Sequence, residues 1–240
     1  MIEVKNLSKS FKEVQAVKNA SFTVNKGEIV GLLGENGAGK TTTLRMLATM
    51  LKPTGGNAEI NGYSIIENSQ KVRGEIGILF GGDVGLYDRL TVRENIRYFA
   101  QLNGMSKKEA EDSINYLVEE LELKEYMDRR VGKLSRGMKQ KVSIARSIVH
   151  KPTVMLFDEP TTGLDVTAAK LVHDFILQCR EQGKSIIFSS HSMQEVEKLC
   201  DRIIIINKGE IIEEGTIEYF KDKYQSNSME DIFIRLVGGK

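Results

Sequence analysis

The segment from Gly34 to Thr41 constrains the fold of this chain more than any other part of the sequence. It reads GENGAGKT, which fits the pattern GxxxxGK[ST], and it follows an apolar run at residues 29–33. The residues after it carry apolar side chains at helical spacing, at Leu44, Leu47 and Ala48. Glycines let the backbone curl with its N–H groups pointing inward, and a helix start adds partial positive charge. The segment therefore predicts a phosphate-binding loop between a β-strand and an α-helix.

The residue types of this loop predict a nucleotide site. Lys40 is expected to reach the β and γ phosphates, and the hydroxyl of Thr41 is expected to ligate Mg²⁺. The phosphates would be held by the loop and the first helical turn, that is by Asn36, Gly37, Ala38, Gly39, Lys40, Thr41 and Thr42. ATP and Mg²⁺ are therefore the expected ligands.

A second half of the site is predicted much later in the chain, where an apolar run at residues 154–157 ends in Asp158 and Glu159. Asp158 can hold Mg²⁺ through the water shell of the ion. Glu159 is placed to polarise an attacking water as general base. A strand that ends in two acids often only marks the point where it meets solvent, but next to a phosphate loop it predicts nucleotide hydrolysis.

The pattern along the chain predicts an α/β fold. Short, fully apolar runs at residues 154–157, 186–189 and 203–206 are typical of buried parallel strands, and helical patterns at 167–180 and 192–200 separate them. Strands are also expected at 2–4, 22–24, 29–33 and 77–80, with a hairpin around Asn61-Gly62. Residues from about 90 to 147 are helical in pattern, and Thr91-x-x-Glu94 and Ser106-x-x-Glu109 predict two helix starts there. This helical block reads as an insertion into the α/β core.

Composition narrows the class of protein. The chain has 240 residues, a formal net charge of +1 and 28% charged residues, so no strong field attracts nucleic acid or anionic lipid. The N-terminus does not read as a signal peptide, and the longest aliphatic run, 203–206, is far shorter than the ~20 residues of a membrane helix. Cys179 and Cys200 are expected to be small buried hydrophobes in a cytosolic protein. His150 and His173 are expected at the surface.

Three further motifs carry a family resemblance. The segment from Leu134 to Gln140, LSRGMKQ, precedes Asp158 and resembles the signature motif of ABC transporter ATPases, in the form of small bacterial exporters. Thr161 to Asp165, TTGLD, resembles the D-loop of that family, and Ser189 to His191, SSH, resembles its switch-histidine motif. The resemblance covers essentially the whole chain, and the sequence near the C-terminus, 230–236, is similar to the tail of small ATPases linked to sodium export.

The resemblance implies a fold. It predicts a P-loop NTPase (RecA-like) core with an N-terminal antiparallel β subdomain and an inserted α-helical subdomain. Residues 1–240 would form a single ABC ATPase domain, with 1–82 and 148–240 in the β subdomain and core. Residues 83–147 would form the helical insertion that carries the signature motif.

The resemblance also implies a composite site. ABC ATPases bind two nucleotides between two head-to-tail subunits, so a homodimer is expected when ATP is bound. One subunit would contribute the phosphate loop and Glu159, and the other would contribute Ser135 and Gly137 at a helix start aimed at the γ phosphate. His191 would fix the γ phosphate and the water. Phe11 would stack on adenine, with a core aromatic as the alternative.

The implied activity is ATP hydrolysis that powers an integral-membrane permease from the cytoplasmic side of the membrane. The form of the signature motif favours export over import, and sodium is the cargo suggested by similarity. A soluble ABC ATPase acting on ribosomes or DNA is the first alternative, although no nucleic acid partner is expected from the near-neutral charge. A non-hydrolysing regulator is the second, and Glu159 and His191 argue against it.

The sequence departs from the family at one place. Most relatives have a glutamine after the strand at 77–80, where this chain reads Phe80-Gly81-Gly82-Asp83. The expected glutamine position is thus Gly81, which has no side chain. Asp83 or a water is hypothesised to fill the vacancy, and the alternative is that the loop is only a turn.

Overall fold

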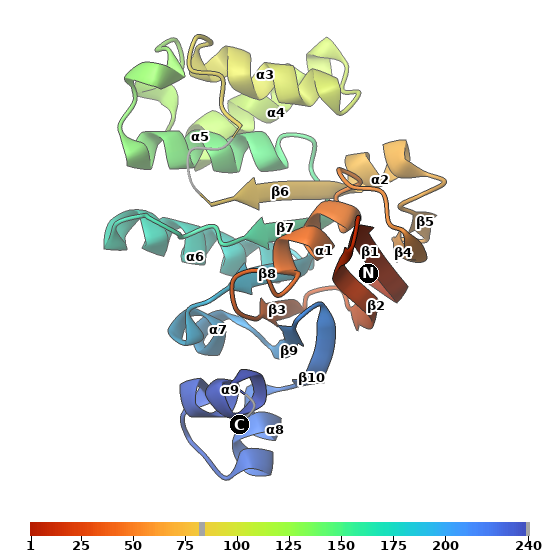
Figure 1. Cartoon of the computed structure of the whole chain (residues 1–240). Helices are drawn as coiled ribbons and strands as arrows, with labels where there is room; N and C mark the ends of the chain where they lie inside the picture. Colours follow the sequence, from red (N-terminus) through yellow and green to blue (C-terminus); the bar gives the residue numbers. More distant parts are fainter. Residues whose placement is uncertain (82–84, 239–240) are drawn as a thin grey trace.

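The computed structural model describes residues 1–81 and 85–238, and it has two β-sheets with helices around them (Figure 1). The larger sheet has the strand order β10-β9-β3-β8-β7-β6. Its strands are β3 (Ile29–Leu33), β6 (Ile76–Phe80), β7 (Val154–Asp158), β8 (Ser185–Ser190), β9 (Arg202–Asn207) and β10 (Glu210–Gly215). All neighbouring strands in this sheet are parallel except β9 and β10, which are antiparallel. The α/β class predicted from the sequence is confirmed.

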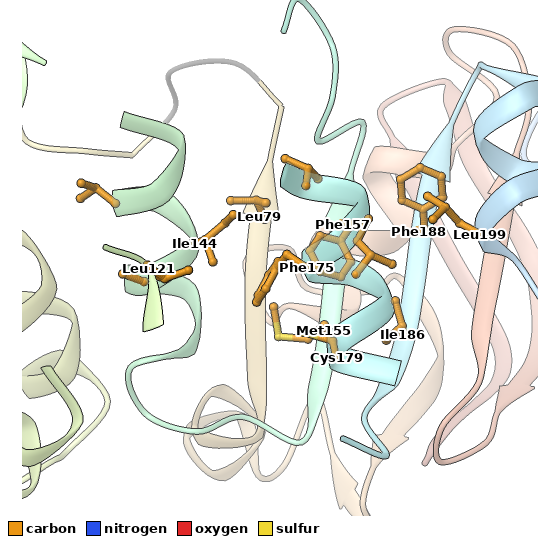
Figure 2. Packing of buried hydrophobic residues seen from close by; sticks show 14 of the residues in the cluster. Leu79, Leu121, Ile144, Met155, Phe157, Phe175, Cys179, Ile186, Phe188 and Leu199 are labelled. Carbon is orange, nitrogen blue, oxygen red and sulfur yellow. The ribbon is translucent and has the colours of Figure 1, made fainter. Parts of the chain in front are cut away.

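The central strands are buried on both faces, and successive residues pack into two different cores. In β7, Met155 and Phe157 face one core, whereas Val154 and Leu156 face the other. Side chains point alternately to the two sides of a strand, so fully apolar runs suit a sheet that is covered on both faces. Figure 2 shows the first core, in which Phe157 meets Phe175 edge to face with ring centroids 5.9 Å apart.

The first core lies between the sheet and one layer of helices. That layer contains α5 (Arg136–Ile148), α6 (Val166–Glu181) and α7 (Met193–Leu199). The same core continues into α3 (Val92–Leu102) and α4 (Lys107–Glu120), and into the C-terminal helices α8 (Ile217–Tyr224) and α9 (Met229–Val237). α3, α4 and α5 form the block at the top of Figure 1. No helix within residues 1–81 and 85–238 is long and apolar enough to cross a bilayer.

The second core lies between the other face of the sheet, α1 (Lys40–Leu47) and a smaller antiparallel sheet. That sheet has the order β2-β1-β4-β5, with β1 (Ile2–Phe11), β2 (Val14–Val24), β4 (Gly55–Ile60) and β5 (Tyr63–Ser64). β4 and β5 are joined at Asn61 and Gly62, which have φ values of 50° and 80°. Positive φ at both central residues is what a tight hairpin turn requires, so the predicted hairpin is confirmed. α2 (Ser69–Glu75) then leads into β6.

Local signals at helix starts are also confirmed. Thr91 and Ser106 each accept a hydrogen bond from the backbone N–H three residues on, and Glu94 and Glu109 bond back to the cap residues. Each capping box satisfies two backbone donors that the helix leaves free. α6 ends at Glu181, and Gly183 follows with a φ of 75°.

The histidine prediction was wrong. His150 is half-buried, and its Nε2 donates to the carbonyl oxygen of Ile76 at 2.9 Å. Burial lowers the pKa of His150 below its ordinary value. His173 is also half-buried, because its ring packs beside Glu195 at the N-terminal end of α7. Both side chains therefore have a fixed place in the structure instead of an open surface position.

Candidate nucleotide-binding and hydrolysis site

The phosphate loop connects the end of β3 to the start of α1, as predicted. Gly39 is the N-cap residue of α1 and has a φ of 113°, which an L side chain rarely adopts. A Cβ atom at Gly39 would also lie 2.6 Å from the carbonyl oxygen of Ala16. Only glycine fits there, and its conformation lets the helix begin directly at the loop with its free N–H groups turned to the same side.

Lys40 is the first residue of α1, and its side chain is only 4% exposed. Its Nζ donates to the carbonyl oxygens of Gly34 at 2.7 Å and Glu35 at 3.2 Å, so the ammonium group lies over the curl of the loop. Oε1 of Glu159 is 3.5 Å away. A buried cation with flexible carbonyl partners can exchange them for the oxygens of a phosphate.

Asp158 and Thr41 meet at the end of β7. Thr41 Oγ1 donates to Oδ1 of Asp158 at 3.1 Å, and Ser189 Oγ donates to the same oxygen at 2.7 Å. A carboxylate and a hydroxyl are oxygen ligands of the kind that Mg²⁺ prefers. Residues 1–81 and 85–238 contain no group of three or more His, Cys, Asp or Glu side chains that could hold a metal ion.

Glu159 stands directly after β7 in an uncommon backbone conformation, with a φ of 47°. Its N–H is directed at both the carbonyl oxygen and the hydroxyl of Ser189, each at 3.1 Å. Its Oε2 lies 3.3 Å from Nδ1 of His191 and accepts from the Thr162 hydroxyl at 3.3 Å. Left-handed conformations of non-glycine residues cost free energy and persist where the surroundings enforce them, often at functional sites.

Some of these groups line one cleft of about 800 Å³, whereas Lys40 and His191 are not among the described residues that line it. Four of its lining residues were predicted as site residues from the sequence: Asn36, Thr41, Asp158 and Glu159. Five others also line it: Arg45, Met50, Phe80, Gly81 and Thr162. The cleft thus joins the predicted phosphate side to the predicted acidic side, although they are more than a hundred residues apart in the sequence.

Phe11 lies at the end of β1 and its side chain is 47% exposed. The alternative that Phe11 is a core aromatic is therefore wrong. Lys9 Nζ lies 5.1 Å from the ring centroid, and an exposed ring of this kind offers a face for stacking.

Ser135 and Gly137 are at the start of α5, in the helical block. Ser135 is the N-cap residue and its Oγ accepts from the backbone N–H of Met138 at 3.3 Å. Ser135 is exposed, and neither residue is among the described residues that line the cleft. Within one chain, the structure therefore does not bring this helix start into the cleft formed by the phosphate loop and the two acids.

Gly81 approaches the acidic side of the site through its backbone. Its N–H donates to the carbonyl oxygen of Asp158 at 2.8 Å, and a Cβ atom at Gly81 would lie 2.0 Å from the carbonyl oxygen of Glu159. No side chain fits at Gly81 in this conformation, so a glutamine there would require the backbone to move. Asp83, hypothesised to replace the glutamine, lies outside the described residues, and that hypothesis stays a prediction.

Ser189 and Thr162 were predicted only as members of the SSH and TTGLD motifs, yet both contact the acidic pair. β7 and β8 are parallel neighbours, and Asp158 is in register with Ser189. A polar residue at the end of the strand next to an acidic strand end is a signal that could have identified Ser189. For Thr162 no such signal exists, because its contact depends on the turn that follows Glu159.

Comparisons with known proteins agree with this geometry. The family model described as ABC transporter matches residues 17–162. The chain is 45% identical to the ABC transporter ATP-binding protein NatA of Bacillus subtilis, over 100% of the chain and 99% of that protein. It is 40% identical to the Nod factor export ATP-binding protein I of Burkholderia lata, over 89% of the chain and 70% of that protein.

A solved structure has the same fold. It is a dimeric, post-hydrolysis ATP-binding cassette bound to ADP and phosphate. The TM-score is 0.78 at 27% identity, and the match covers 90% of this chain and 98% of the other.

Proposed function

The chain belongs to the ABC transporter family as an ATP-binding, ATP-hydrolysing subunit, and from this premise we propose that it powers export through a separate membrane permease. The observation that carries the proposal is the joining of phosphate loop and acidic pair in one cleft, with Thr41 and Asp158 3.1 Å apart. The roles of single residues in binding and hydrolysis are also part of the proposal.

In the proposed hydrolysis, Lys40 and the loop from Asn36 to Thr42 bind the phosphates of ATP. Glu159 accepts a proton from the attacking water, because its carboxylate is partly exposed to the cleft and held by neighbours on both sides. His191, 60% exposed and 3.3 Å from that carboxylate, contacts the γ phosphate and the water. Phe11 stacks on the adenine.

We assign Mg²⁺ to the space between Thr41 and Asp158. Mg²⁺ usually keeps several waters and binds through one or two protein oxygens together with substrate phosphates. The hydroxyl–carboxylate pair fits that pattern, and Ser189 orients the carboxylate through its 2.7 Å hydrogen bond. The ion would neutralise charge that develops on the phosphates.

We propose that the site is completed by a second copy of the chain in a head-to-tail homodimer. The exposed helix start at Ser135 and Gly137 supports this, because a helix N-terminus is a good anion site and this one does not line the cleft of its own chain. The dimeric cassette with a similar fold also supports it. ATP binding would close the dimer, and hydrolysis would let it open.

The docking surface for the permease is proposed at a groove of about 620 Å³ between the helical block and the core. Its lining comes from both sides and includes Ile78, Phe80, Tyr87 and Phe99. Tyr87, Leu102 and Met50 are 47%, 61% and 60% exposed, which makes an apolar rim. Exposed apolar patches mark surfaces where another protein binds.

The groove and the nucleotide cleft share a wall. Met50 and Phe80 line both hollows, so only one layer of side chains separates them there. A packed layer transmits displacement because protein interiors are dense. This arrangement supports coupling between a permease segment in the groove and a nucleotide in the cleft.

Export is favoured by the form of the signature motif and by the similarity to the Nod factor export ATP-binding protein. Sodium as cargo is proposed from the similarity to sodium-export ATPases stated above. The protein would bind at the cytoplasmic side of the membrane through the permease. A function on ribosomes or DNA has less support, since the formal net charge is only +1.

The proposal is tested by comparing purified wild type with Glu159→Gln in ATP and Mg²⁺. The variant keeps the size and hydrogen bonding of the side chain but is a poor base, so we expect turnover to fall by roughly 10²-fold or more while ATP still binds. Size measured in solution should show an ATP-bound dimer that the variant traps. The exchange Glu13→Gln, at an exposed position, is the matched control.

Three results would contradict the proposal. Turnover at the wild-type rate in Glu159→Gln would remove Glu159 as the base. A monomer in the variant, under conditions where wild type dimerises, would remove the two-site arrangement. Co-purification with ribosomes instead of a membrane protein would overturn the transport assignment.

A further inference from the structure

Glu195 lies in the first turn of α7, behind the nucleotide site. Its backbone N–H donates to Oγ of Ser192, the cap residue, at 3.4 Å. In the capping boxes at Thr91 and Ser106, the glutamate side chain returns to the cap backbone. The Glu195 side chain is bonded elsewhere, and it is only 14% exposed.

The carboxylate of Glu195 joins two elements. Ser190 Oγ, at the end of β8, donates to Oε2 at 2.7 Å, and His173 Nε2, in α6, lies 2.9 Å from Oε1. Burial alone would raise the pKa of Glu195, but hydrogen bonds from Ser190, Thr161 and His173 outweigh burial and lower the pKa. The charged carboxylate is therefore the stable form, with an acceptor oxygen for each neighbouring element.

Ser190 connects this carboxylate to the site. Along the end of β8, Ser189 bonds to Asp158 and His191 lies beside Glu159, and Ser190 is between them. Oγ of Ser190 also accepts from the backbone N–H of Ser192 at 3.0 Å, which ties the turn that carries His191. Ser190 is therefore held in place. This restricts the backbone of its two neighbours, Ser189 and His191, which contact the acidic pair.

The other partners of Glu195 lie on the segment that follows Glu159. Thr161 begins the TTGLD loop, and His173 lies further along, in the helix that the loop enters. Glu195 therefore holds the turn with His191 against the loop after Glu159. A displacement of either segment would change the 3.3 Å distance between His191 and Glu159.

We propose that Glu195 is a positioning residue for ATP hydrolysis: through Ser190 and His173 it sets the position of His191 relative to Glu159. This inference rests on the proposed roles of Glu159 and His191. Glu195 does not line the cleft and need not touch ATP. Its effect should fall on the chemical step, because positioning of a reacting group affects turnover more than the affinity for substrate.

The test measures kcat and KM for ATP in Glu195→Ala and Glu195→Gln. Alanine removes both acceptors, so we expect kcat to fall roughly 10- to 100-fold, with KM changed by less than about threefold. Glutamine keeps one acceptor oxygen for Ser190 and can pair with His173 in its other tautomer, so it should restore kcat to within about threefold of wild type. Glu197→Ala is the matched control, since that carboxylate belongs to the same helix but pairs with Lys221 at 3.0 Å.

A second variant reaches the same contact from the other side. Ser190→Ala should lower kcat as Glu195→Ala does, and the double variant should be no worse than the worse single variant, because both remove one interaction. Wild-type kcat in folded Glu195→Ala would overturn the proposal. So would equal losses in the alanine and glutamine variants, or additive losses in the double variant.

The outcome can be separated from the test of the proposed function. If Glu159→Gln loses turnover while Glu195→Ala keeps it, the positioning role fails and the base remains. If Glu159→Gln keeps turnover, the role of the base fails, and the premise of this inference fails with it.

Discussion

The helix starts of α1 and α5 are both proposed to bind phosphate, but their surroundings within the chain differ. At α1 the helix start is enclosed: Gly39 packs against Ala16, and Lys40 is 4% exposed and bonded to two loop carbonyls. At α5 the helix start is open: Ser135 is exposed, and Gly137 has no atom within 4 Å of the place a Cβ would take.

The difference shows that a capped helix N-terminus alone does not make a binding site. Both helices present free N–H groups, but only α1 has a buried cation, a curled loop and two acids around it. The open start of α5 has room for a molecule that the chain itself does not supply.

Lys40→Met tests the enclosed side and should have the largest effect. Methionine keeps the length of the side chain but removes the charge, so we expect ATP turnover to fall on the order of 10³-fold and ATP binding to weaken. A turnover assay and nucleotide titration measure both. Lys26→Met, at an exposed position, is the control that should behave as wild type. Turnover within tenfold of wild type in Lys40→Met would show that the enclosed loop is not the phosphate site.

Gly137→Asp tests the open side. A Cβ atom at Gly137 would meet no atom within 4 Å, and an acid in the first helical turn favours the helix, so thermal stability should stay the same or rise. The same charge would repel a γ phosphate, so turnover should fall by roughly 10²-fold. Gly137→Ala is the uncharged control and should lose much less. Full turnover in Gly137→Asp would mean that α5 contacts no phosphate.

Mixing the two variants separates action within one chain from action between chains. In a head-to-tail dimer of Lys40→Met with Gly137→Asp, one site holds both changes and the other holds neither. Random mixing should therefore restore up to about a quarter of the wild-type sites, as the symmetry of such a dimer dictates. A mixture as inactive as its components would contradict the shared site.

Gly81→Ala tests how tightly the enclosed side is packed. The added Cβ would lie 2.0 Å from the carbonyl oxygen of Glu159, so the backbone must shift. We expect the free energy of unfolding to drop by about 1–3 kcal/mol, together with a loss of turnover. Gly74→Ala, in α2 with no atom within 4 Å, is the matched control and should not be destabilised. Unchanged stability and turnover in Gly81→Ala would show that Gly81 does not stay this close to the carbonyl oxygen of Glu159 in solution.

The smallest expected effect compares two caps. Ser135→Ala and Ser106→Ala each remove a hydroxyl that accepts one backbone hydrogen bond at 3.3 Å, and each should cost ~1 kcal/mol of stability in urea unfolding. Only Ser135→Ala should also lower turnover, because Ser106 caps a helix far from any phosphate in our proposal. Equal turnover in the two variants would remove Ser135 from the site.

Much of this arrangement could be predicted from the sequence, because short-range signals determine it. The pattern GENGAGKT, the apolar runs of the central strands, and the caps at Thr91 and Ser106 are local features, and all of them appear in the structure. β1 and β2 were predicted only in part, and β10 was not predicted. β10 reads EIIEEG and is exposed at alternate residues, so too little of it is buried to give an apolar pattern.

The contacts behind the site could not be predicted, because they join elements distant in the sequence. The pattern Ser192-x-x-Glu195 is a local signal for a helix start, but nothing local shows that the glutamate bonds to Ser190 and to His173 of α6. His173 had no motif around it, and its role depends on how α6 lies beside α7. The close approach of Gly81 to Glu159 is of the same kind, since glycine in a loop usually indicates only a turn.

The division of the core by the central sheet bears on how a lineage of such chains can diversify. α1 and the antiparallel sheet rest on one core, whereas the helical block next to the proposed docking groove rests on the other. Substitutions in the helical block change the packing of the first core, whereas α1 and the phosphate loop rest on the second core. The surface beside the docking groove can in this way adapt to many different permeases while the phosphate loop and α1 keep their packing.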